Sequence, residues 1–352
     1  MADNVIIMGA GASADCGAPL MRQFFDKAAE LHRQGVLGGI AADYDLVMRA
    51  MTELQRVNAK TALDLYNLES VWGAFEMAGI TGRLGPLRGT EVEEAIPALK
   101  RLIVATVEGS TRFPVNQANS GQWGWGWLSG YDPMARALAR AMREKTARRT
   151  SVLTFNYDIA LEMSFLRAGV PFDYCLHPEI PPGHMPLCKL HGSIGWTQLQ
   201  DGLIVPATLP KECPQDCALG QTTVHIHLGE RLRQQAAGKG DGVAMIVPPT
   251  DSKLGHRRAL AQVWRHAADQ LAEASRVAIV GFSLPPTDEF FRSFFGVSTL
   301  SPKHLEKFMV FDPNKETAAR LRDLLSGSAV SRFQWIEGPW SVQDSQLQAF
   351  LA

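Results

Sequence analysis

The sequence predicts a doubly wound α/β protein, built on a parallel sheet that carries a large helical insertion after its first strand. Short apolar runs rich in β-branched residues recur along the chain, each bounded by Gly, Pro, Asn or Asp. These runs alternate little between apolar and polar residues, which is typical of strands buried on both faces of a parallel sheet. Helical patterns lie between several of them, and such alternation of strands and helices indicates a Rossmann-like architecture.

Each of these apolar runs is a predicted strand. The strands are expected at residues 5–8, 151–155, 187–190, 244–247, 277–280, 308–311 and 333–336. Between the later strands, apolar residues recur at helical spacing, which predicts helices at residues 259–274 and 316–325. We expect a single domain over residues 1–352.

Two long stretches interrupt the alternation and are predicted to be insertions in this domain. The first covers about residues 20–150 and is mostly helical in pattern. Its helices are expected at residues 20–33, 44–57, 68–78, 91–107 and 133–148. The second covers about residues 197–241 and is irregular, because it is richer in Gly, Pro, Cys and His.

The composition excludes several classes of protein. With 352 residues, 46% of them hydrophobic, the chain can bury a sizeable core, and its net charge of -1 gives no reason to expect direct binding to nucleic acid. No apolar run approaches the roughly 18–20 residues of a membrane helix, and the first residues lack the basic segment of a signal peptide. The five cysteines are an odd number, which fits free thiols in a reducing cytoplasm.

The first candidate site follows the first predicted strand. Gly9, Gly11 and Ser13 lie between that strand and a helix, where glycines let the backbone approach a pyrophosphate and the helix N-terminus offers N–H donors. The spacing differs from the dinucleotide-binding fingerprint of dehydrogenases, because Ala14 stands where the last glycine would be. A tight turn without a ligand is the alternative interpretation.

Polar residues also follow the next two strands of the predicted sheet. Asn156 and Asp158 come after one strand and His191 after the other, and strand carboxyl ends face the ligand crevice in an open α/β sheet. Asn and Asp there can orient an amide, a ribose or a water, and His can transfer a proton near neutral pH. The structural alternatives are a helix cap for Asn and Asp, and a core position for His.

A fourth segment follows the strand at residues 277–280. Gly281 permits a close approach of the backbone, and Ser283 can form a hydrogen bond to a ribose or a phosphate. Alone, this segment could be an ordinary loop between a strand and a helix. Together, the four segments lie at the same edge of the predicted sheet, and we interpret them as a nucleotide-binding crevice.

With these segments in this order, the chain resembles the bacterial sirtuin-like domain family, a branch distinct from the protein-deacylase sirtuins. The matching segments are residues 9–13 with Gly17 and Pro19, residues 155–158, residues 189–193 with Trp196, residues 247–250 with Lys253, and residues 281–288. The resemblance implies a hydrolase with NAD as its substrate, which acts in anti-phage defence. It also implies a homo-oligomer or a partner ATPase, nuclease or sensor protein.

The resemblance implies a role for each candidate residue. His191 would be the catalytic histidine, Asn156 would position the ribose or the attacking water, and Asp158 would hold the nicotinamide amide. The other binding residues would be Gly9, Gly11 and Ser13 at the pyrophosphate, Arg22 at a phosphate, Gly281 and Ser283 at the adenosine, and Asp312 or Asn314 at the adenine ribose.

Two positions depart from the deacylase sirtuins. Met21 stands where they have an aromatic residue next to the nicotinamide, and Phe155 stands where they have Gln before the catalytic Asn. Both departures argue against acyl-lysine chemistry. The alternatives are an NAD-dependent protein deacylase or ADP-ribosyltransferase, and a non-catalytic sensor of NAD or ADP-ribose.

No metal is expected in this protein. Cys213, Cys217, His225 and His227 lie roughly where deacylase sirtuins carry a four-cysteine zinc module, but their spacing does not match it. The tryptophans in residues 123–127 are interpreted as packing residues, with a lid or an interface as the alternative. The arginines of residues 136–149 are interpreted as a solvated helix face, with a partner or nucleic-acid surface as the alternative.

Overall fold

The structure is a computed structural model that describes most of the chain. It describes residues 2–55, 63–128, 130–144, 148–236, 244–247, 254–285, 289–301 and 303–351. Several residues of the matching segments lie outside these ranges: Pro248, Pro249, Thr250, Lys253, Pro286, Thr287 and Asp288. The expectations for these seven residues therefore cannot be compared with the structure.

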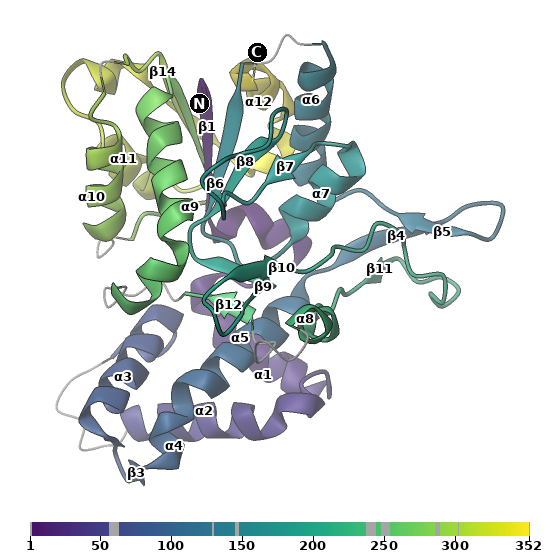
Figure 1. Cartoon of the computed structure of the whole chain (residues 1–352), viewed down its shortest axis with the longest axis vertical. Coiled ribbons are helices and arrows are strands. Elements are labelled where there is room, and N and C mark those ends of the chain that lie inside the picture. Colours follow the sequence, from purple (N-terminus) through teal and green to yellow (C-terminus); the bar gives the residue numbers. More distant parts are fainter. Residues whose placement is uncertain are drawn as a thin grey trace.

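A seven-stranded sheet forms the upper half of the molecule in Figure 1, and its strand pairs are all parallel. In order across the sheet, the strands are β15 (Phe333–Glu337), β14 (Lys307–Asp312), β13 (Arg276–Val280), β1 (Asn4–Met8), β6 (Thr150–Thr154), β8 (Met185–Lys189) and β7 (Phe172–Asp173). All of them except β7 match predicted strands. The prediction of a doubly wound parallel α/β fold is confirmed.

Helices cover both faces of this sheet (Figure 1). In β1, Ile6 and Met8 belong to one hydrophobic cluster and Val5 and Ile7 to the other. The first face is covered by α6 (Tyr131–Glu144), α7 (Ala160–Ala168) and α12 (Asp344–Leu351), and the second by α9 (Leu254–Glu273), α10 (Glu289–Ser298) and α11 (Lys315–Arg322). None of the described helices combines the length and the apolar character needed to cross a bilayer.

The chain changes its direction across the sheet at β1. After β1 it continues to β6 and β8 on one side, and it returns later to β13 on the other side. The register places Met8 of β1 beside Thr154 of β6 and Val280 of β13. Because ligands of open α/β sheets bind outside the carboxyl ends of the strands at such a point, the loops after these three strands are the expected ligand site.

The first insertion forms a group of helices beyond the carboxyl ends of the strands, in the lower half of Figure 1. Its elements up to residue 110 are α1 (Phe24–Arg33), α2 (Ala41–Leu54), α3 (Leu68–Thr81), β2 (Arg83–Leu84), β3 (Leu87–Arg88), α4 (Thr90–Glu93) and α5 (Ala95–Ser110). Short 3-10 helices occur at Ala10–Cys16, Met21–Gln23, Gly38–Ile40, Gly327–Arg332 and Trp340–Val342. The buried side chains of α1 to α5 belong to the same hydrophobic cluster as the first face of the sheet, so the insertion shares the core of the sheet.

Two strand features differ from the sequence prediction. The run at 244–247 forms β12 (Ala244–Ile246), which is not in the parallel sheet: it pairs antiparallel with β9 (Gly192–Gln198), and β10 (Ile204–Pro206) completes this small sheet. The mostly helical insertion also contains the hairpin of β4 (Phe113–Gln117) and β5 (Trp123–Trp125). From the second insertion, β11 (Thr223–Val224) pairs with β4 to complete a three-stranded sheet, and α8 (Gly229–Ala236) follows β11 in the chain. A short apolar run has the same pattern in either kind of buried sheet, so the sequence does not identify its partner strand.

Candidate functional site

Three glycines bring the turn after β1 against the loop after β13. The amide of Gly9 donates to the carbonyl oxygen of Val280 at 3.0 Å, and the amide of Gly11 donates to that of Gly281 at 2.9 Å. Gly281 has a φ of 60°, which favours glycine, and a Cβ there would lie 2.5 Å from the carbonyl carbon of Gly11 and against the amide nitrogen of Ala12. The contact therefore excludes a side chain at position 281.

The turn after β1 is a 3-10 helix, Ala10–Cys16, and not the start of an α-helix. The amides of Gly9, Gly11 and Ala12 already donate to main-chain carbonyls. Ser13 is 1% exposed, so its side chain lies inside the turn. The contact of Gly9, Gly11 and Ser13 with a pyrophosphate stays a prediction, and the structure gives the two glycines the additional role of joining two loops.

The side chain of Asn156 is held by the turn after β1. Its Nδ2 donates to the carbonyl oxygen of Gly9 at 2.9 Å, to Ser13 Oγ at 3.0 Å and to the Tyr131 hydroxyl at 3.3 Å. Because a carbonyl oxygen can only accept a hydrogen bond, the contact with Gly9 determines which end of the amide is the nitrogen. Among the described residues no hydrogen bond engages Asn156 Oδ1, so the oxygen is the end left for a ligand or a water.

His191 lies directly after β8, next to the loop that carries Asn156. β6 and β8 are paired up to their last residues, so the two segments leave the sheet at the same level. The centroid of the imidazole lies 5.0 Å from that of the Phe155 ring and 6.2 Å from that of the Tyr157 ring. The predicted catalytic histidine is therefore packed against the residues on either side of the predicted catalytic asparagine.

A buried ion pair holds the same loop from the other side. Lys189 Nζ lies 2.7 Å from Glu162 Oε1, and the two side chains are 1% and 0% exposed. Lys189 Nζ also donates to the main-chain carbonyl of Asp158 at 2.6 Å. Burial raises the pKa of the Glu162 carboxyl, and the ammonium of Lys189 opposes this rise. The pair thus ties α7 and β8 to the main chain of the Asn156 loop.

Three predicted binding residues accept hydrogen bonds from main-chain amides at or just before helix starts. Asp158 accepts from the amide of Ala160 at 3.0 Å, near the start of α7. Asp312 accepts from the amide of Asn314 at 2.7 Å, and Asn314 accepts from that of Glu316 at 2.8 Å as the cap of α11. Burial also raises the pKa of the Asp312 carboxyl. Capping explains these residues without a ligand, so their binding roles stay predictions.

Two other predicted binding residues are exposed. The main-chain carbonyl of Ser283 accepts a hydrogen bond from Arg320 at 3.0 Å, which holds the loop after β13 against α11. Arg22 lies on the 3-10 helix Met21–Gln23, where 81% of its side chain is exposed and its guanidinium is 3.8 Å from Asp64. In the described part of the chain no hydrogen bond or ion pair links Arg22 to the turn after β1. Its role at a phosphate stays a prediction.

The four candidate zinc ligands are not brought together. Among the described residues, no three His, Cys, Asp or Glu side chains are arranged to hold a metal ion. Burial and the neighbouring Cys217 raise the pKa of Cys213 to about 11. His225 Nδ1 lies 2.8 Å from a main-chain oxygen, and His227 Nδ1 lies 3.4 Å from Glu108 Oε2. The metal-free site stays a prediction.

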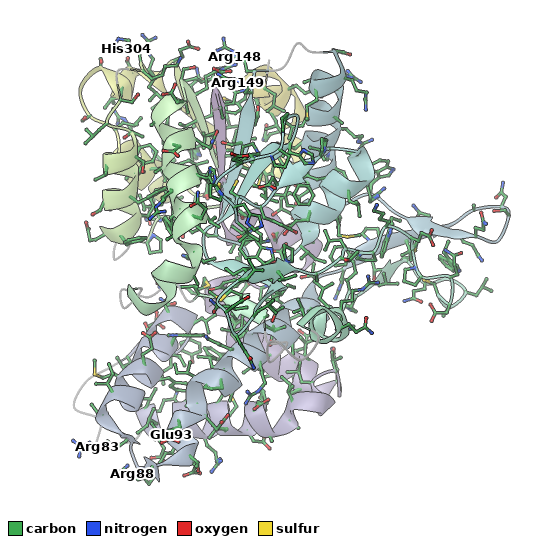
Figure 2. The ribbon with its side chains drawn as sticks, viewed as in Figure 1. Arg83, Arg88, Glu93, Arg148, Arg149 and His304 are labelled. Atoms are coloured by element: carbon green, nitrogen blue, oxygen red, sulfur yellow. The ribbon has the colours of Figure 1, made fainter. Side chains whose placement is uncertain are left out.

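The tryptophan segment and the basic residues have packing contacts. The Trp127 ring carries the guanidinium of Arg136 at 4.4 Å and that of Arg167 at 4.0 Å, measured to the ring centroid. Arg148 and Arg149 lie at the end of the sheet that holds the chain's N-terminus (Figure 2), and each lies near an acidic side chain. These contacts fit the interpretation of packing and of a solvated face.

Two residues of the site have no sequence signal of their own. Tyr131 contacts Ser13 and Asn156, but in the sequence it only precedes a predicted helix. Trp340 donates from Nε1 to the carbonyl oxygen of Ala12 at 3.3 Å, although it lies far along the chain, after the last strand. Lys189 did carry a signal, because a lysine inside an apolar strand needs a buried partner.

Comparison with known proteins finds solved sirtuin structures, while no family model and no curated protein matches the chain. A Sir2 homologue in complex with NAD is 12% identical with a TM-score of 0.44, over 99% of this chain and 88% of that chain. A structure described for the mechanism and regulation of Sir2 enzymes is 12% identical with a TM-score of 0.39, over 99% and 92%. A complex of Sir2 with an inhibitor, 2′-O-acetyl-ADP-ribose and a deacetylated p53 peptide is 10% identical with a TM-score of 0.36, over 98% and 92%. At these values the likeness carries no functional assignment by itself.

Proposed function

We propose that this chain is an NAD+ glycohydrolase, which cleaves the nicotinamide–ribose bond to give nicotinamide and ADP-ribose. The observation that carries the proposal is the orientation of Asn156. Its amide nitrogen is used by Gly9, Ser13 and Tyr131, while its Oδ1 has no partner among the described residues and belongs to the loop packed against His191. The motif resemblance of these segments to NAD-hydrolysing sirtuin-like proteins supports the same assignment.

The arrangement suits a hydrolysis in which the leaving group needs no proton. The water oxygen forms a bond to the ribose carbon as the bond to the nicotinamide nitrogen breaks, and the electron pair leaves with neutral nicotinamide. Asn156 Oδ1 can accept a hydrogen bond from that water and orient it, and His191 can take its proton or that of a ribose hydroxyl. The positive charge that develops on the ribose is stabilised by fixed dipoles whose negative end faces it, such as the side-chain amide of Asn156 with its Oδ1.

The residue that packs beside His191, Phe155, departs from the deacylase sirtuins and supports hydrolysis over transfer to an acyl-lysine. Phe155 stacks on Phe282 with ring centroids 4.8 Å apart and meets Phe291 edge-on at 5.7 Å. Deacylase sirtuins have Gln at the position of Phe155. We therefore propose water, and not an acylated peptide, as the acceptor.

The test is incubation of the purified chain with NAD alone, across a dilution series. Release of nicotinamide and ADP-ribose in equal amounts is the expected result. Turnover that requires an acyl-lysine peptide would identify a deacylase instead. Binding of NAD without turnover at every concentration would indicate a sensor or a hydrolase that needs its activator. Repeating the series with the product of a neighbouring gene shows whether a partner is needed.

From the resemblance, we also propose that NAD depletion serves anti-phage defence in the cytoplasm. A toxic activity of this kind has to be held back until it is needed, and assembly is one means of doing so. We propose that a homo-oligomer or a partner ATPase, nuclease or sensor protein activates the chain. The expected signature is a rate per molecule that rises with concentration or with added partner.

EDTA is expected to leave the turnover of the wild-type chain unchanged, since the mechanism assigns no step to a metal. A chelator that stops turnover, together with stoichiometric zinc in the protein, would contradict the metal-free mechanism.

Substitution Asn156→Ala is expected to lower nicotinamide release about 100-fold, because the attacking water loses the acceptor that orients it. Asn116→Ala, an exposed position in β4, is the matched control and should keep full activity.

A further inference from the structure

A pair of hydroxyl groups from two distant segments contacts the Asn156 amide. Tyr131 is the first residue of α6 and is 1% exposed, and its hydroxyl lies 2.7 Å from Ser13 Oγ. Both oxygens also lie within hydrogen-bond distance of Asn156 Nδ2, at 3.0 Å from Ser13 and 3.3 Å from Tyr131. One amide hydrogen is taken by the carbonyl oxygen of Gly9, so the other is shared between the two hydroxyls.

The direction of these hydrogen bonds follows from what each group can do. The amide nitrogen only donates, so the Tyr131 oxygen accepts from it. Ser13 and Tyr131 are both buried, and either hydroxyl of the pair can donate its hydrogen to the other oxygen. Burial raises the pKa of Tyr131 well above its ordinary value, so the phenol stays protonated and can donate.

Several contacts fix Tyr131 independently of Asn156. Its ring meets the Trp340 ring edge-on with centroids 5.3 Å apart, and Trp340 in turn donates to the carbonyl oxygen of Ala12 in the turn after β1. The next residue, Asp132, is buried and forms an ion pair with Arg167 of α7 at 3.1 Å. The hydroxyl of Tyr131 therefore occupies a place set by α6, by α7 and by the C-terminal segment.

We propose that Tyr131 is a positioning residue for Asn156, which keeps the amide nitrogen turned inward and the Oδ1 turned toward the attacking water. This inference rests on the proposed hydrolysis. Without the phenol, the amide hydrogen that the two hydroxyls share keeps only Ser13 Oγ, which has itself lost a hydrogen-bond partner. The side chain then spends less time in the orientation that places the water.

Replacing Tyr131 by Phe removes only the hydroxyl and keeps the ring against Trp340. Tyr131→Phe is expected to lower kcat for nicotinamide release about tenfold while the KM for NAD stays within about twofold. A residue needed only for folding would lower the melting temperature without this split between kcat and KM. Tyr44→Phe, in a half-buried tyrosine of α2 that stacks on His32, is the matched control and should keep both constants.

The variant Ser13→Ala supplies a second measurement. Ser13→Ala and Tyr131→Phe each break the same hydroxyl pair, so the double variant should lose less than the product of the two single losses. Full turnover in Tyr131→Phe, or independent effects in the double variant, would overturn the inference.

A spectroscopic readout separates this inference from the proposed function, because it needs no turnover. The side-chain amide signals of Asn156 can be identified by their loss in Asn156→Ala. They should shift and exchange faster with solvent in Tyr131→Phe but not in Tyr44→Phe. A wild-type chain that stays inactive at every concentration, with and without the partner, would contradict the proposed hydrolysis, while this measurement would still decide the role of Tyr131. Unchanged amide signals would reject that role.

Discussion

His191→Ala is expected to lower nicotinamide release about 10³-fold while the Kd for NAD stays within about tenfold of that of the unchanged chain. The substitution removes the group that takes the proton. The predicted contacts with the pyrophosphate and the adenosine come from other segments, namely the turn after β1 and the loop after β13, so binding should persist. Calorimetric titration with NAD and a nicotinamide assay under activating conditions measure the two quantities separately.

The control for this variant is His184→Ala, at an exposed position in the loop before β8. It should match the unchanged chain in turnover and in NAD affinity. Because His191 is largely buried, its replacement by Ala leaves a cavity, and a melting curve must accompany the activity assay. His191→Gln also removes the imidazole but fills more of the space that His191 occupies. Near wild-type turnover in a folded His191→Ala protein would show that the mechanism assigned to this histidine is wrong.

The centre of the sheet was predictable because its strands have few ways to pack. All five residues of β1 and of β6 are buried, and strands buried on both faces favour apolar and β-branched residues, as in Val5 to Met8 of β1 and Val152 and Leu153 of β6. The sequence did not predict the order of the strands, but parallel strands joined through helices leave their carboxyl ends at one edge whatever their order. The apolar runs alone therefore predicted that Gly9, Asn156, His191 and Gly281 lie at one edge of the sheet.

The contacts inside the site depend on pairings over long distances in the chain, which no local pattern specifies. Tyr131 and Asn156 come from different elements, and Trp340 reaches the turn after β1 from the opposite end of the chain. The glycine motif predicts a surface for a pyrophosphate, and the structure adds a contact between Gly11 and Gly281 that the motif does not specify. Glycine in a sequence indicates a close approach, but it does not tell what approaches.

Gly281→Ala is expected to abolish NAD binding and turnover and to lower the melting temperature. The residue has a φ of 60°, where an L side chain costs about 1–2 kcal/mol, and its Cβ would lie 2.5 Å from the carbonyl carbon of Gly11. Since the neighbours are main-chain atoms of the turn after β1, the clash can be relieved only by separating the loop after β13 from that turn. That movement also displaces Gly9, whose carbonyl oxygen holds the Asn156 amide.

Gly82→Ala separates the backbone strain from the clash, because Gly82, at the end of α3, has a φ of 67° but a Cβ there would meet no atom within 4 Å. It should cost about 1 kcal/mol of stability and leave NAD turnover unchanged. Gly11→Ala gives a milder clash than Gly281→Ala at the contact between the same two loops. Its Cβ would lie 2.9 Å from the Gly281 Cα, and the φ of Gly11 is not positive. We therefore expect losses of NAD affinity in the order Gly281→Ala, Gly11→Ala, Gly82→Ala. If Gly281→Ala binds NAD as well as Gly82→Ala does, the two loops do not form the nucleotide site.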